Sequence, residues 1–99
     1  MIKLDLKFPL LNLDGEELKD ERNQSVLASK VFASLLMAQK SGDAVKYFDW
    51  ATTLHKTGVV EVDAADFTAI KTLVKDNTDH LMMISKAQLI KYFDTVKIK

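Results

Sequence analysis

The chain has 99 residues, and its 14 Lys and Arg side chains balance its 14 Asp and Glu side chains. The zero net charge argues against a chain whose main role is to hold DNA or RNA, because such proteins usually carry a basic excess on one face. The absence of cysteine excludes disulfides, thiolate metal sites and cysteine nucleophiles. No run approaches the ~20 apolar residues of a membrane span. We expect one folded domain over residues 1–99, suited to a reducing cytoplasm.

The first residues predict a strand, because apolar side chains alternate with charged ones at Ile2, Leu4, Leu6 and Phe8. Asp14-Gly15 then favours a tight turn, since both residues tolerate a positive φ. In that register Leu11 faces Leu18 and Leu13 faces Glu16. We therefore expect a β-hairpin or a small antiparallel sheet within about residues 2–19.

The next element is predicted to be a helix over about residues 24–40, with Asn23 or Ser25 as its cap. Its apolar stripe is centred on Leu27, Val31, Leu35 and Ala38. Val26, Ala33 and Met37 lie on the other side of the helix, so more of its circumference is apolar than a simple surface helix requires. Two explanations stay open. The helix is central to the core, or its second face meets another chain.

Residues 41–77 contain the clearest local signals. Asp43 is a suitable cap for a helix over about 44–57, and Gly58 suits the left-handed position after its end. The short β-branched run of residues 59–62 follows, and Asp63 with Asp66 predicts the start of another helix over about 64–76. The first of these helices turns Tyr47, Phe48, Ala51, Leu54 and His55 to one side. Trp50 lies at the margin of this stripe, where tryptophan is either a lid on the core or an interface anchor.

A polar break at residues 76–80 separates these helices from a last one over about residues 86–95. Ser85 and Gln88 have the spacing of a capping box for this helix. The tail from Val96 continues it or forms a final strand. No internal repeat is visible. The predicted class is therefore α+β, with an N-terminal β-hairpin or small antiparallel sheet packed on four helices.

Residues able to carry chemistry are few. His55 and His80 are the only histidines, and neither has a second ligand or a carboxylate at a recurring spacing. A calcium loop with Gly58 at its sixth position would need carboxylates where Thr53, His55 and Ala64 stand. Five acids within residues 14–21 fit a solvated turn better than a metal site. We expect no catalytic residue, no metal and no cofactor, so the chain is not predicted to be an enzyme.

One weak basic and aromatic patch lies near the C-terminus, made by Lys86, Lys91, Lys97 and Lys99 with Tyr92 and Phe93. A solvated helix edge explains it better than a nucleic-acid surface.

Several segments together resemble a group of small proteins, about 100 residues long, from tailed phages and prophages, whose role is unknown. These are Leu13-Asp14-Gly15, Ser41-Gly42-Asp43 with Lys46-Tyr47, Val60-Glu61-Val62 with Asp66, Ile70-Lys71 with Val74, and Gln88 with Phe93-Asp94. The resemblance covers nearly the whole chain but rests on capping and core residues. It implies a viral origin and a part in particle assembly, and it assigns no functional residue.

The expected function is thus that of a non-enzymatic phage or prophage protein, an assembly factor or minor structural component that acts through protein–protein contacts. The alternative is a small regulator that binds nucleic acid or a host factor. The predicted interaction surface comprises Val26, Ala33, Met37 and Trp50. A protein partner or self-association is expected, without membrane or small-molecule substrate, in the cytoplasm of a bacterial host or on the virion.

Overall fold

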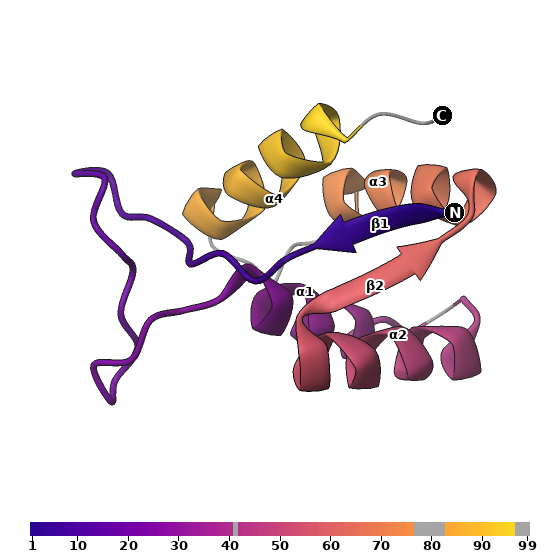
Figure 1. Cartoon of the computed structure of the whole chain (residues 1–99), viewed down its shortest axis with the longest axis horizontal. Helices are drawn as coiled ribbons and strands as arrows, with labels where there is room; N and C mark the ends of the chain where they lie inside the picture. Colours follow the sequence, from indigo (N-terminus) through magenta and orange to yellow (C-terminus); the bar gives the residue numbers. More distant parts are fainter. Residues whose placement is uncertain (41, 77–82, 97–99) are drawn as a thin grey trace.

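The computed structural model describes residues 1–40, 42–76 and 83–96. Along the chain its elements are β1 (Ile2–Asp5), α1 (Ala28–Met37), α2 (Ala44–Thr57), β2 (Val59–Val62), α3 (Ala64–Asp76) and α4 (Met83–Thr95). The two strands lie between the pair α1 and α2 and the pair α3 and α4 (Figure 1). The predicted α+β class, a small antiparallel sheet with four helices, is confirmed.

β1 and β2 pair antiparallel, with Ile2 opposite Val62 and Leu4 opposite Val60. These four side chains are buried, while their charged neighbours along the strands point to solvent. The sequence placed the sheet within residues 2–19 and indicated only a short β-branched run at residues 59–62, whereas in the structure this run is the second strand of the sheet. The inward valines of β2 extend the apolar face of β1 beside Ile2 and Leu4, whereas the segment after Leu10 has too few apolar residues to do so.

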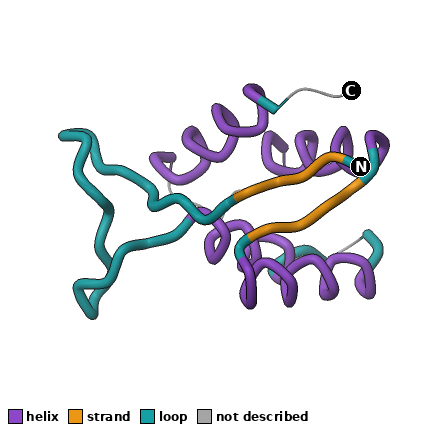
Figure 2. The backbone as a smooth tube through the Cα atoms, viewed as in Figure 1, coloured by secondary structure: helices purple, strands orange, loops and turns teal. Residues whose placement is uncertain are grey.

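Residues 9–27, called the arm from here on, leave the end of β1, project away from the helices and return to α1 (Figure 2). A ring of three backbone hydrogen bonds closes the base of the arm. Leu10 N donates to Val26 O, Val26 N donates to Leu18 O, and Leu18 N donates to Leu10 O, each over 2.8 Å. Because the Leu10 side chain is fully buried, this ring ties the arm to the core.

Beyond the ring the arm makes the same turn twice, eight residues apart. Asn12 Oδ1 accepts from the amides of Asp14 and Glu16, and Asp20 Oδ1 accepts from those of Arg22 and Gln24. The last loop residue of each turn has a positive φ, 85° at Gly15 and 62° at Asn23, as expected for a three-residue hairpin loop. The sequence analysis missed this repeat.

The first turn also differs from the predicted hairpin in register. Leu11 pairs with Glu17 instead of Leu18, and Asn12 N donates to Glu16 O. Leu13 therefore does not share a buried side with the other leucines, and it is 95% exposed. The side-chain bonds of Asn12 explain the difference, because they close a loop one residue longer than a two-residue turn.

α1 begins at Ala28 instead of residue 24, and neither Asn23 nor Ser25 caps it. Its N-cap is Leu27, which forms no side-chain capping bond. The chain before the arm supplies the acceptors instead, since Ala28 N donates to Phe8 O and Ser29 N donates to Leu6 O, each over 2.9 Å. A tertiary contact thus replaces the expected local cap.

The segment with the clearest local signals folds as predicted, with α2 and α3 at the expected bounds. Asp43 Oδ1 accepts from Lys46 N, and Asp63 Oδ1 accepts from Asp66 N. Gly58 follows α2 with φ 77°, and a Cβ at this position would collide with Lys7 Cγ. Glycine is therefore required there both for the backbone conformation and for the close approach of residue 7.

α4 begins at Met83, three residues before the predicted start, and ends at Thr95 as predicted. Gln88 makes no capping box with Ser85. Its amide instead binds the arm, with Gln88 Oε1 accepting from Leu11 N over 2.8 Å and Gln88 Nε2 donating to Leu11 O over 2.7 Å. The side-chain amide of Gln88 thus bonds both the backbone N–H and the backbone C=O of Leu11, as a residue of a neighbouring β-strand would do. The predicted polar break, apart from Asp76, and the predicted tail, apart from Val96, lie outside the described residues.

The buried residues of the strands, the arm base and all four helices form one core. At its centre the ring of Phe93 meets those of Phe32 and Phe67 edge to face, with centroids 5.4 and 6.2 Å apart. α4 also covers β1 through Tyr92, whose hydroxyl accepts from Asp5 N over 2.8 Å. These contacts join residues distant in sequence, which no local pattern could have specified.

Candidate functional site

An open apolar groove lies between α1 and α2. Ala33 and Met37 from α1 face Phe48, Ala51 and Thr52 from α2 across a volume of about 480 Å³. A second hollow of about 400 Å³ adjoins it, and the two share Met37 and Phe48. We call the two hollows together the α1–α2 groove.

Two large apolar side chains in the groove are exposed to solvent, Phe48 by 60% and Met37 by 47%. The prediction that Phe48 points inward is wrong. α1 ends at Met37, three residues earlier than predicted, so it leaves the first half of α2 partly uncovered. Val45, one turn before Phe48, is also 72% exposed. Neighbouring exposed apolar side chains of this size mark interaction sites more often than scattered single ones do.

The charged residues that line the groove are all basic. Lys30 and Lys56 border the first hollow and Lys40 borders the second, while neither hollow has an Asp or Glu in its lining. None of these lysines forms an ion pair within the described part of the chain. A surface with an apolar floor and a cationic rim favours a ligand that combines apolar and acidic groups.

His55 lines this groove and is exposed, although its helical spacing places it on the same side of α2 as the buried residues Ala51 and Leu54. Ser34 lines the same hollow, so a nucleophile and a base are candidates. However, among the described residues no hydrogen bond joins Ser34 to His55, and no carboxylate of the lining could orient the imidazole. The groove lacks the geometry of an activated serine.

The four residues predicted as an interaction surface do not come together. Ala33 and Met37 share the groove. Val26 lies half-buried at the arm base, packed against the core. Trp50 is also half-buried, on the other side of α2, where its ring stacks on Tyr47 with centroids 5.8 Å apart. It borders a small hollow of about 130 Å³ between α2 and α3, so it is a lid on that helix pair.

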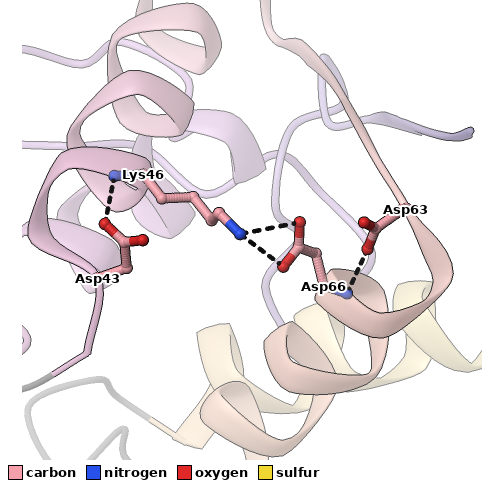
Figure 3. Close-up of polar contacts among 4 residues, drawn as sticks. All are labelled: Asp43, Lys46, Asp63 and Asp66. Carbon is pink, nitrogen blue, oxygen red and sulfur yellow. Dashed lines mark hydrogen bonds and ion pairs between the residues drawn. The ribbon is translucent and has the colours of Figure 1, made fainter.

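The side of α2 near Trp50 carries an ordered polar cluster, shown in Figure 3. Lys46 Nζ lies 3.1 Å from Asp66 Oδ1, which joins the first turn of α2 to the first turn of α3. The hydrogen bond that Lys46 Nζ donates to Asp66, and then the charge of Asp66, raise the pKa of Lys46 above its ordinary value. A lysine whose pKa is raised stays protonated at neutral pH and cannot act as a base. We assign the cluster a structural role.

The tip of the arm is the second exposed feature. Leu13 projects from the first turn beside Asp14 and Glu16, which form no ion pair among the described residues. Glu17 is different, since its carboxylate accepts from Ser25 Oγ and lies 3.5 Å from Lys19 Nζ. The acidic stretch is therefore part of a hydrogen-bonded arm, and it is more than the solvated turn that the sequence suggested.

The basic and aromatic patch near the C-terminus is not assembled as a stacking surface. Phe93 is 1% exposed, and the Tyr92 hydroxyl is engaged by Asp5 N. Lys86 and Lys91 lie on α4, and the other two lysines of the patch are outside the described residues. The ring of Phe93 is thus inside the protein, and the half-buried ring of Tyr92 packs against Phe8 and Phe93 instead of standing free for a base.

The described residues contain no group of three or more His, Asp or Glu side chains that could hold a metal ion. Within the same ranges, no helix is long and apolar enough to cross a bilayer. Comparisons of the chain with family models, with curated proteins and with solved structures give no match.

The sequence found two of the groove residues, Ala33 and Met37, from their place outside the main helical stripe. It missed Phe48, the basic rim and Leu13. The sequence did contain a signal for the basic rim, but in its charges and not in its apolar residues. The arm has an excess of acids, and the two helices that follow it have an excess of lysines.

Proposed function

We propose that this chain is a non-catalytic protein-binding module and that the α1–α2 groove is its binding surface. The observation that supports this most directly is the exposure of Phe48 and Met37 at the centre of an open groove with a basic rim. Grooves between two helices commonly bind an amphipathic segment, with apolar anchors on the floor and charged contacts at the edge.

For the biological setting we propose particle assembly in a tailed phage or prophage, in the cytoplasm of the bacterial host or on the virion. The support is the resemblance of the capping and core segments to small proteins of that group. An assembly factor needs binding surfaces and no catalytic centre, which agrees with the character of the groove.

Site-specific crosslinking tests the binding function. Ser34 is exposed and lines the groove, so a photoreactive amino acid placed there would react with whatever occupies it in the producing cell. The crosslinked protein is then identified by mass spectrometry. We expect Phe48→Asp to abolish this crosslink, because a carboxylate replaces the main apolar anchor.

Met83→Asp is the matched control. Met83 is 76% exposed at the start of α4 and is not part of the groove, so this variant makes the same chemical change elsewhere and should keep the crosslink. The proposed function fails if no protein is crosslinked from Ser34, or if the same product forms with Phe48→Asp.

A further inference from the structure

We propose that the occupant of the α1–α2 groove is the arm of a second copy of this chain. This inference rests on the proposed function, because it names the partner of the same groove. It is carried by two surfaces of one molecule, the projecting arm tip and the open groove, which both expose apolar side chains and which carry opposite charges.

The arm tip has the form of a preorganised ligand. Leu13 stands at the end of a turn that four hydrogen bonds hold over 2.8–3.1 Å: two to Asn12 Oδ1, one from Asn12 N to Glu16 O and one from Gly15 N to Asn12 O. A rigid apolar knob loses little conformational entropy on binding. Since Leu13 is 95% exposed, its side chain does not occupy the groove of its own chain.

The charges of arm and groove are opposite. Residues 9–27 hold five acids (Asp14, Glu16, Glu17, Asp20, Glu21) and two bases (Lys19, Arg22), a net charge of −3. The rest of the chain therefore has 9 acids and 12 bases, a net charge of +3. Three of those bases, Lys30, Lys40 and Lys56, border the groove, and no acid does. Such complementarity guides association and fixes orientation.

The contact would be heterologous, because arm and groove are different surfaces of the same protomer. Each copy could then donate its arm to one neighbour and accept the arm of another, which produces a ring if the rotation closes and a filament if it does not. A single arm tip buries less surface than a standard interface, so each contact should be weak and sensitive to salt.

The test combines two variants with light scattering and sedimentation at increasing protein concentration. Leu13→Asp disables the arm and Phe48→Asp disables the groove, and both positions are exposed enough for the fold to tolerate the change. At low salt we expect the wild type to associate as the protein concentration is raised to about 1 mM. Added salt should then dissociate it. Each variant alone should stay at the monomer mass of 11.2 kDa.

Mixing the two variants gives the decisive result. The mixture still contains one intact arm (on the Phe48→Asp chain) and one intact groove (on the Leu13→Asp chain), so it should form a dimer of twice the monomer mass and nothing larger. Circular dichroism of both variants checks that each is folded. Met83→Asp should associate like the wild type.

Several results would overturn the proposal. They are a monomeric wild type over the whole concentration range, association that survives Leu13→Asp, and a mixture that stays monomeric. The crosslink from Ser34 separates this failure from failure of the proposed function. A crosslink to a different protein, with a monomeric wild type, leaves the groove as a binding surface and removes only the second copy as its occupant.

Discussion

The arm and the segment from α2 to α3 reach an ordered structure by opposite means. In the α2–α3 segment, local signals set the helix ends and apolar side chains such as Leu54, Phe67 and Ile70 enter the core. In the arm, order comes from backbone hydrogen bonds and from Asn12 and Asp20, and most side chains are exposed. The comparison teaches that an exposed segment can be well defined without a core of its own, which leaves its side chains available for another task.

The largest contrast should come from the same substitution in the two regions. Leu54→Ala in α2 removes a side chain that is only 1% exposed, so we expect the free energy of unfolding to fall by about 2–5 kcal/mol. Leu13→Ala in the arm should change it by less than about 0.5 kcal/mol. Urea denaturation of both variants measures the difference. Similar losses would mean that Leu13 is buried against the protein in solution.

A pair of glycines gives the next test. Gly58→Ala forces a left-handed residue and a collision with Lys7, so we expect a loss of about 1–2 kcal/mol in unfolding free energy. Gly15→Ala meets the same backbone strain at φ 85°, with nothing within 4 Å of the added carbon. Its effect should be confined to the arm. Thermal unfolding reports the first change, and hydrogen exchange of the arm amides reports the second.

Gln88 connects the arm to α4, so Gln88→Ala should affect both the arm and the stability of the whole fold. It removes both hydrogen bonds to the backbone of Leu11, each worth about 0.5–1.5 kcal/mol. We expect a loss of about 1–2 kcal/mol and faster exchange of the Leu11 amide. The control is Lys91→Ala, an exposed position of the same helix. An unchanged exchange rate at Leu11 would contradict the contact.

Asn12→Ala tests the arm alone. The change leaves the amides of Asp14 and Glu16 without their acceptor, so they should exchange faster, while global stability falls by no more than about 1 kcal/mol. Asp20→Ala does the same in the second turn and serves as the comparison. If the first turn presents Leu13 to a neighbour, only Asn12→Ala should weaken self-association, and equal weakening by both variants would contradict that role.

The smallest effect is expected at alkaline pH. Hydrogen bonding to Asp66 raises the pKa of Lys46, and burial raises the pKa of Tyr92. In both cases the folded-state pKa lies above the unfolded value, so the stabilisation is fully present below about pH 10 and is lost as pH rises through the folded-state pKa. Above about pH 10, the melting temperature of Lys46→Met and of Tyr92→Phe should fall less steeply with rising pH than that of the wild type. Parallel plots of melting temperature against pH for wild type and variants would contradict this.

Features that depend on neighbouring residues could be predicted from the sequence, and features that depend on contacts between distant segments could not. The bounds of α2 and α3, with Asp43, Gly58 and Asp63 at their ends, depend on neighbouring residues and were predicted. The partner of β1 and the start of α1 depend on contacts between distant segments, and they were not. For the site, helical spacing identified Ala33 and Met37. Phe48 was missed because its exposure depends on where α1 ends.

The arm repeat is a case where the signal was present but unrecognised. Leu10, Leu18 and Val26 recur every eight residues, as do Asn12 with Asp20 and Gly15 with Asn23. The residues of each pair are chemically similar but not identical, and each contributes through backbone geometry. A search for apolar periodicity at helix or strand spacing therefore does not detect them.

The pairing of Ile2 with Val62 also has a consequence for synthesis on the ribosome. β1 leaves the ribosome long before β2, so its apolar face and its unpaired edge wait for a partner while the arm, α1 and α2 are made. Contacts between such distant residues form slowly because a long loop must close first. The sheet therefore cannot form before Val62 emerges, and until then the nascent chain is most exposed to wrong strand pairing.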